Sequence, residues 1–271
     1  VIASKRSDLK KTDWEIDFYS RPIIDENGKK RWELLITSTN NFKDKKTFKW
    51  EKICPASSVN SIWLKDAFDE AIDEAYLQGW DKPSVIRCWR SSMKTMIKRA
   101  ADQIGIELIS SRRTYTLLQW LIERERSFYP QQKGYTVNLA PPLNPITNQA
   151  IPLPEEVRGE SWSFASLSLN TLREADEWEI EFSNLIPIKD SINENISIPG
   201  IRLFSPKRSL ALAAWLGGLE PAKLLIEGTQ IILEAGQADR WLVTDVEEEA
   251  KKVIENNFIN TKLYADGLQF I

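Results

Sequence analysis

Basic side chains crowd one segment of this sequence. Between positions 87 and 113 it has seven arginine or lysine residues and only two acidic residues. Such a surplus of positive charge is typical of a patch that binds an anionic partner, most simply phosphate, although a solvated helix face would have the same composition. Tryptophans lie among these cations, and the bases of single-stranded RNA stack on aromatic rings. The candidate RNA contacts, which lie within about 35 residues, are Arg87, Trp89, Arg90, Lys94, Lys98, Arg112, Arg113 and Trp120.

A second, smaller set of the same type lies in the last third of the chain. Lys207 and Arg208 stand near the start of a predicted helix that carries Trp215. The amino end of a helix is suited to anions because its backbone N–H groups and its dipole favour negative charge. Most of the 11 tryptophans lie on apolar faces, where core packing is the expected role. We keep Lys207, Arg208 and Trp215 as further candidate RNA contacts.

Residues for catalysis are scarce. The chain has no histidine and two cysteines, which excludes histidine-dependent nucleophiles and a complete cysteine and histidine zinc site. A magnesium-dependent nuclease needs several carboxylates around its metal, and Asp17 on a predicted strand could be the first. The strand over 84–89, which should deliver the second, delivers Arg87 and Arg90 instead. We therefore expect no enzyme, no catalytic residue, no metal and no cofactor, and we interpret Asp17 as a solvent-facing strand residue.

The first half of the chain alternates the patterns of strands and helices. Apolar and polar residues alternate over 13–37 around Asn27-Gly28, which predicts a hairpin, and a third strand is expected over 47–53. Apolar spacings of three and four predict three helices with short strands between them, in the order helix 62–78, strand 84–89, helix 92–104, strand 106–109 and helix 115–128. The order β-β-β-α-β-α-β-α is that of the ribonuclease-H-like fold, which we take as an analogy.

Proline marks the middle of the chain. Six of the 13 prolines lie within residues 130–160, which predicts a linker or extended arm. The sequence therefore predicts a two-domain α+β protein, with an N-terminal domain over 1–129, a linker over 130–160 and a C-terminal domain over 161–271.

The C-terminal half has a different order of elements. Strands are expected over 162–169 and 201–204, and an N-cap at Ser205-Pro206 should open a helix. Three strands, a helix opened by a capping box at Thr244-Asp245 and a last strand over 268–271 should follow. This α-β-β-β-α-β order resembles that of a nuclease domain. We call it degenerate, because neither Glu227 nor Glu234 has the lysine two residues later that is expected on a nuclease strand.

The two halves differ in charge. The chain has 36 basic and 39 acidic residues, but residues 1–135 hold 25 basic and 19 acidic ones, whereas residues 136–271 hold 11 and 20. No apolar run reaches the roughly 18 residues of a membrane span, and the first residues lack the core of a signal peptide. We expect a cytosol-like compartment with Cys54 and Cys88 reduced.

Several blocks of the sequence resemble one family. They include Trp14-Glu15-Ile16-Asp17-Phe18-Tyr19-Ser20-Arg21-Pro22, Arg90-Ser91-Ser92-Met93, Ser111-Arg112-Arg113, Leu118-Gln119-Trp120-Leu121, Pro199-Gly200-Ile201 and Ala213-Ala214-Trp215-Leu216-Gly217-Gly218-Leu219-Glu220-Pro221. In this order, over nearly the whole chain, they are similar to blocks of the Tab/Atab family of RNA-binding proteins of cyanobacteria and chloroplasts. Related chains continue past the segment matching 268–271 into a strand with a Trp-Leu-Leu motif linked to RNA binding.

The resemblance implies a function. It implies a factor that binds A/U-rich single-stranded RNA and promotes translation of photosystem I subunits or assembly of photosystem I, in the cyanobacterial cytosol or a stroma-like compartment. Its partners would be such RNA and photosystem subunits or the translation machinery, without DNA. The first alternative is an assembly factor that acts through protein contacts of its acidic half, and the second is the magnesium-dependent nuclease.

Overall fold

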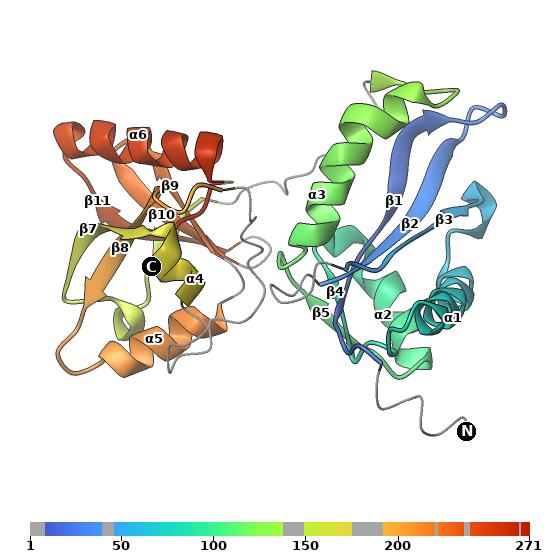
Figure 1. The fold of residues 1–271 in the computed structure, drawn as a ribbon, viewed down its shortest axis with the longest axis horizontal. Coiled ribbons are helices and arrows are strands. Elements are labelled where there is room, and N and C mark those ends of the chain that lie inside the picture. The colour runs from blue at the N-terminus through green and yellow to red at the C-terminus, as the bar shows by residue number, and fades with distance from the viewer. Residues whose placement is uncertain are drawn as a thin grey trace. The chain divides into compact units, whose positions relative to one another are not determined.

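The computed structural model describes residues 9–39, 46–137, 149–174, 192–219, 222–235, 239–265 and 267–271. The chain divides into two compact units, Val1–Pro145 and Ile146–Ile271, and both mix helices with strands (Figure 1). The predicted fold class, α+β with two domains, is confirmed. None of the helices in the described ranges is long and apolar enough to cross a membrane.

A five-stranded sheet organises the first unit. Its strands are β1 (Trp14–Ile24), β2 (Lys30–Ser38), β3 (Lys49–Cys54), β4 (Val85–Cys88) and β5 (Glu107–Ser110), in the order β3-β2-β1-β4-β5. The first three form an antiparallel meander, and β4 and β5 continue the sheet in parallel with β1. The turn between β1 and β2 needs a positive φ, which Gly28 supplies at 74°.

Helices follow the strands as the sequence predicts. They are α1 (Ser61–Leu77), α2 (Lys94–Gln103) and α3 (Tyr115–Glu123), which continues as a π-helix over Arg124–Phe128. Short 3-10 turns span Ala56–Ser58, Ser91–Met93 and Tyr129–Gln131. The element order β-β-β-α-β-α-β-α is therefore observed, and the helix ends differ from the predicted ones by only a few residues.

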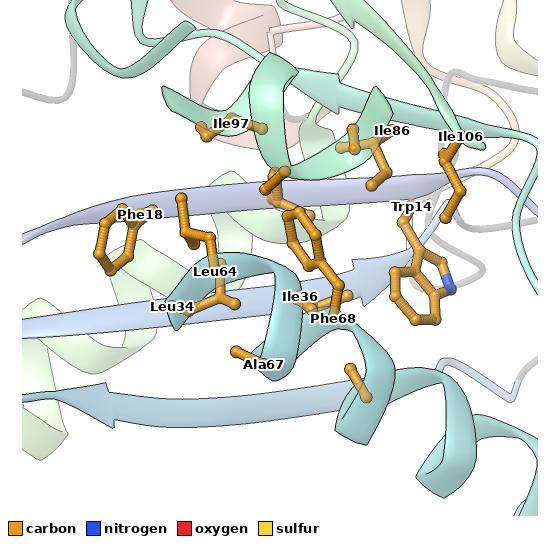
Figure 2. Packing of buried hydrophobic residues seen from close by; sticks show 14 of the residues in the cluster. Trp14, Phe18, Leu34, Ile36, Leu64, Ala67, Phe68, Ile86, Ile97 and Ile106 are labelled. Carbon is orange, nitrogen blue, oxygen red and sulfur yellow. The ribbon is translucent and has the colours of Figure 1, made fainter. Parts of the chain in front are cut away.

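One face of this sheet holds the main core. Alternate residues of β1 point to opposite faces, and Trp14, Ile16 and Phe18 pack against buried residues of α1 and α2 (Figure 2). Asn60 caps α1 by accepting hydrogen bonds from the N–H groups of Ile62 and Trp63, at 3.0 and 2.9 Å. The opposite face of the sheet carries polar side chains and a small apolar cluster of Leu35, Leu117 and Leu121, through which α3 packs.

The second unit has two sheets. Four strands lie in the order β6-β11-β10-β9, and β7 and β8 form a separate antiparallel pair. Its elements are β6 (Ile151–Pro152), a 3-10 turn (Glu155–Val157), β7 (Ser161–Ser168), α4 (Leu169–Arg173), β8 (Ser197–Phe204), α5 (Ser209–Gly218), β9 (Lys223–Glu227), β10 (Gln230–Ala235), β11 (Asp239–Asp245) and α6 (Glu248–Tyr264). Residues of both sheets and of α6 share one core, in which Phe164 of β7 lies 6.4 Å from Phe258 of α6 between ring centroids.

The last residues of the chain join these two sheets. The backbone of Phe270 pairs with β8, since Ile201 N–H donates to Phe270 O at 3.1 Å and Phe270 N–H donates to Pro199 O at 3.2 Å. The side-chain amide of Gln269 bonds to both the N–H and the C=O of Leu224 on β9, at 2.7 and 3.0 Å. The strand predicted over 268–271 is thus a single bridge to Gly200.

Both predicted helix starts in this unit are wrong. The N-cap of α5 is Arg208 rather than Ser205, and the N-cap of α6 is Glu247 rather than Thr244 or Asp245. Val246 N–H donates to Thr229 O at 2.8 Å, which keeps the chain extended past β11 and delays α6.

The proline-rich segment 130–160 contains the boundary between the units. Before the boundary, Thr136 N–H donates to Pro22 O at 2.8 Å, and Ile24 N–H donates to Gly134 O at 2.9 Å. After the boundary, β6 pairs in parallel with β11. Both described parts of the predicted linker therefore pack on a unit, and residues 138–148 lie outside the described residues.

Candidate nucleic-acid interface

Helix α2 presents an exposed basic side. Lys94, Lys98 and Arg99 are all exposed, whereas Ile97, Ala100 and Ala101 on the other side are buried. Lys98 Nζ lies 2.9 Å from Asp102 Oδ1, one turn further on, in an exposed ion pair. The site prediction did not include Arg99, although Arg99 is one of the seven basic residues between positions 87 and 113. These cations form a solvated positive surface that phosphates can reach.

Arg87, Trp89 and Arg90 lie inside the protein. Their exposed fractions are 8%, 8% and 6%. Arg87 NH2 lies 3.0 Å from Asp13 Oδ2, and the guanidinium of Arg90 lies 4.0 Å from the ring centroid of Trp89. Burial removes these three residues from the surface that a phosphate or a base could reach. This corrects the picture of Arg87, Trp89 and Arg90 as surface contacts, because β4 and the two residues after it lie in a packed layer.

Asp17 is buried, so its interpretation as a solvent-facing residue is wrong. It is fully buried on β1, and its two oxygens accept from Arg90 Nε at 2.6 Å and from Arg21 NH1 at 2.8 Å. Arg90 comes shortly after β4, the strand that lies beside β1 in the sheet. Its side chain therefore reaches Asp17, although the two residues are 73 positions apart in the sequence. The acid that could have been a first metal ligand is instead a buried partner of two guanidiniums.

A second carboxylate extends this polar layer. Glu33 of β2 is 1% exposed, and its Oε2 accepts from Tyr129 Oη at 2.8 Å and from Arg124 NH2 at 3.2 Å. Burial raises the pKa of Tyr129 far above its usual value, so the phenol stays protonated and donates to Glu33. Arg124 is the first residue of the π-helix, and its side chain is buried. Cations therefore compensate the buried acids of this face.

Carboxylates of the second unit are compensated in the same way. Glu234 of β10 is 3% exposed and pairs with Arg240 Nε at 3.0 Å and Lys223 Nζ at 3.1 Å. Glu227 also pairs with Arg240. In the described ranges, no three acidic or cysteine side chains gather closely enough to hold a metal ion.

Arg112 and Arg113 lead into α3 and are half-buried. The N–H of Arg113 donates to Ser111 Oγ at 2.9 Å. The N-cap residue Thr114 makes no side-chain cap hydrogen bond, and Leu117 N–H donates instead to Glu15 Oε2 of β1 at 2.9 Å. A buried carboxyl group of the sheet therefore caps the helix that follows the two arginines.

Burial also changes the acidity of this cap. It raises the pKa of Glu15 to about 8, although hydrogen bonds from backbone N–H groups of Leu117 and Thr116 oppose the shift. The carboxyl group is therefore half-ionised in the folded protein near pH 8, whereas it ionises near its ordinary pKa once the chain unfolds.

Replacing Glu15 with Gln should flatten the pH dependence of stability. The folded state of the wild type holds a proton that the unfolded state releases above its ordinary pKa, so the free energy of unfolding falls as the pH rises towards 8 and levels off above it. We expect a fall of more than about 1 kcal/mol, since each pKa unit of difference is worth about 1.4 kcal/mol. Urea unfolding at several pH values measures it. Glu107→Gln, at an exposed position of β5, should keep the wild-type slope, and an unchanged slope in Glu15→Gln would refute the assignment.

Trp120 lies on the α3 side of the sheet, half-buried against the small apolar cluster. Lys49 Nζ and the Arg124 guanidinium each lie 5.3 Å from its ring centroid. Its ring is thus already engaged by two cations, of which Lys49 is exposed.

The candidates of the second unit have different surroundings. Lys207 is exposed, but Arg208 NH1 donates to Glu155 O at 3.0 Å and so holds the 3-10 turn after β6. The half-buried Trp215 of α5 packs edge-on against Trp241 of β11, with 5.5 Å between ring centroids. Trp215 is therefore a partly covered ring rather than a fully open platform.

Comparison with known proteins covers nearly the whole chain. Residues 13–124 match a family model described as RNA-binding protein Tab2/Atab2 N terminal, and residues 140–271 match one described as RNA-binding protein Tab2/Atab2, C-terminal domain. Among curated proteins, a chloroplastic TAB2 homolog of Zea mays is 30% identical over 96% of this chain and 66% of its own length. A chloroplastic TAB2 homolog of Arabidopsis thaliana is 32% identical over 85% of this chain and 61% of its own length.

The chain therefore spans less than two thirds of the length of these curated relatives. A solved simian T-cell lymphotropic virus intasome in complex with a PP2A regulatory subunit covers 87% of this chain at 13% identity, with a TM-score of 0.27, which is too low to indicate a shared fold. Two family models in the order of the two units, together with relatives at about 30% identity, are decisive: the chain belongs to the Tab2/Atab2 family of RNA-binding proteins.

Proposed function

We propose that this chain binds A/U-rich single-stranded RNA without cleaving it, and that it thereby promotes translation or assembly of photosystem I subunits in a stroma-like or cyanobacterial compartment. Membership of an RNA-binding family supports the RNA, and the exposed basic side of α2 is the observation that carries the site. The photosystem and the A/U preference rest on the family resemblance of the sequence blocks.

Lys94, Lys98 and Arg99 form the centre of the proposed phosphate contact. Three exposed cations of α2 give a positive surface that a flexible backbone of phosphates can track. Arg112 and Arg113 extend the proposal along the segment before α3. Trp120 of α3 lies on the other face of the sheet from α2, and we keep it as a separate proposed stacking contact. Lys207 and Trp215 remain proposed contacts of the second unit.

The buried polar layer supports the proposal of binding without cleavage. A nuclease of this topology would need ionised carboxylates open to a metal, whereas Asp17 accepts from two guanidiniums inside the protein. The strand order β3-β2-β1-β4-β5 supports the ribonuclease-H-like analogy, with Arg90 beside the acid Asp17. Labelled RNA should therefore stay intact with excess protein and Mg²⁺ or Mn²⁺.

Reversing charges on α2 tests the site. We expect Lys94→Glu with Arg99→Glu to weaken binding to an A/U-rich oligomer, and the slope of log affinity against log salt to fall by about 0.7 for each phosphate that the variant no longer neutralises. Arg112→Glu with Arg113→Glu should act in the same direction. The measurement is a fluorescence titration at several salt concentrations, on A/U-rich and C-rich RNA.

The matched control reverses two exposed lysines of α6, Lys252 and Lys262, which changes the net charge equally. Equal weakening by the control pair would show a general charge effect and contradict the α2 site. Wild-type affinity in both test pairs would contradict RNA binding by the whole basic segment.

A protein partner is the second candidate. Four apolar side chains of α6 are exposed by half or more, namely Val253, Ile259, Leu263 and Tyr264, which is unusual for a helix that faces only water. This surface favours an assembly role of the acidic half through contacts with photosystem proteins. Capture of photosystem subunits that survives ribonuclease digestion would favour it, and capture that ribonuclease abolishes would favour the first proposal.

A further inference from the structure

Strand β7 is a long edge strand. It pairs with β8 without a register shift from Ser161 opposite Phe204 to Ser168 opposite Ser197. Among the residues that the structure describes, none pairs with its other side. None of its eight side chains is fully buried, whereas β8 has four buried in a row. A row of backbone N–H and C=O groups is therefore offered along β7.

Other edge strands of the described structure carry protection. Charged side chains interrupt β3 at Lys49, Glu51 and Lys52. Strand β5 has four residues and begins with Glu107, and β6 has two residues, of which one is Pro152. Charges, proline and short length are the usual means by which proteins prevent strand addition at an edge.

Strand β9 is protected in a more specific way. It carries Lys223 and Glu227, and the side-chain amide of Gln269 satisfies both the N–H and the C=O of Leu224 as a neighbouring strand would. Strand β7 has none of these devices, because it has no charged residue, no proline and no bulge over Ser161–Ser168. Its edge is therefore suited to pairing with a further strand.

The two faces of β7 differ. Trp162 and Phe164 pack against the core of the second unit. The alternate residues Ser163, Ala165 and Leu167 point to the opposite face, because side chains alternate along a strand. They are small or apolar and partly exposed, so a strand laid beside β7 would meet no bulky or charged obstacle there.

We propose that β7 pairs in antiparallel fashion with β7 of a second copy of this chain, which makes a twofold dimer with a continuous four-stranded ribbon. An antiparallel pair of identical strands is self-complementary, since each residue near the twofold axis meets its own equivalent or a close neighbour. An uncharged strand meets its own copy without like-charge repulsion, and the small side chains of Ser163 and Ala165 flank the centre at Phe164. One strand pair is a small interface, so the dimer is reversible.

Analytical ultracentrifugation of the chain without RNA tests the dimer. The average mass should rise with concentration from 31.2 kDa towards twice that value. Ala165→Lys places two ammonium groups near the axis and should raise the dissociation constant about tenfold or more. Leu210→Lys, at an exposed apolar position of α5, adds the same charge elsewhere and should leave the constant unchanged. A monomer at every concentration, or a dimer that only Leu210→Lys weakens, would overturn the proposal.

Cross-linking provides a second test of pairing through β7 if the Ala165→Lys variant folds poorly. If the twofold axis passes through residue 164, position 165 lies opposite position 163 of the other copy. If it passes through residue 165, position 165 lies opposite its own equivalent. The double variant Ser163→Cys, Ala165→Cys should therefore oxidise to a disulfide-linked dimer in either register. Ser209→Cys on α5 is the control and should stay monomeric on a non-reducing gel, because the native Cys54 and Cys88 are buried. Equal cross-linking of test and control variants, or none in the test variant, would contradict pairing through β7.

Discussion

Replacing Asp17 with Ala is expected to destabilise the protein by about 3–5 kcal/mol, because it leaves the buried guanidiniums of Arg21 and Arg90 without their shared carboxylate. Both arginines are 6% exposed or less, so water cannot replace the missing carboxylate. The free energy of unfolding in urea, followed by tryptophan fluorescence, measures the loss.

Asp102→Ala is the matched control for this change. Asp102 also pairs with a cation, but its ion pair with Lys98 is more than half exposed on both sides. Exposed ion pairs are worth about 0–1 kcal/mol, so the control should stay within that range of the wild type. Equal effects of the two variants would contradict the buried role of Asp17.

Replacing Gly200 with Ala should also be severe. A Cβ atom at this position would lie 2.2 Å from the carbonyl oxygen of Phe270 and 2.5 Å from its ring. The contact is with backbone, which cannot rotate away, so the last residues of the chain must leave β8 or the strand must distort. We expect a loss of about 3 kcal/mol or more, at the upper end of small-to-large substitutions.

Gly217→Ala provides the comparison. A Cβ atom at Gly217 in α5 would meet nothing within 4 Å, and alanine favours a helix over glycine by about 1 kcal/mol. The control should therefore be neutral or slightly stabilising in a thermal melt. A melting temperature of Gly200→Ala close to that of the control would show that Phe270 does not hold β8.

The first unit could be predicted well because its signals are local. Alternation over 13–37 and the apolar spacing of three and four in the helices depend on residues close in sequence, and they gave the order of elements that the structure shows. The core face of β1, with Trp14, Ile16 and Phe18, follows from the same alternation.

The polar face of the same strand could not be predicted in this way. A polar residue on an alternating strand is typical of a solvated face. Asp17 is instead buried beside Leu35, on the face where α3 packs, and its partner Arg90 lies 73 positions away. Nothing near Asp17 in the sequence indicates that partner. For the same reason, Arg87 and Arg90 look like surface cations in the sequence. The acids that compensate their buried charges are Asp13, just before β1, and Asp17 on β1.

The cap of α3 has a consequence for the time at which the protein can fold. Leu117 N–H bonds to Glu15, which precedes it by 102 positions. During synthesis at about 5–20 residues per second, Glu15 leaves the ribosome roughly 5–20 seconds before the helix that it caps. Until then the carboxylate has no N–H group to bind and stays in water, so β1 cannot close its polar face. A nascent chain that ends before α3 therefore keeps this face of the sheet open to water.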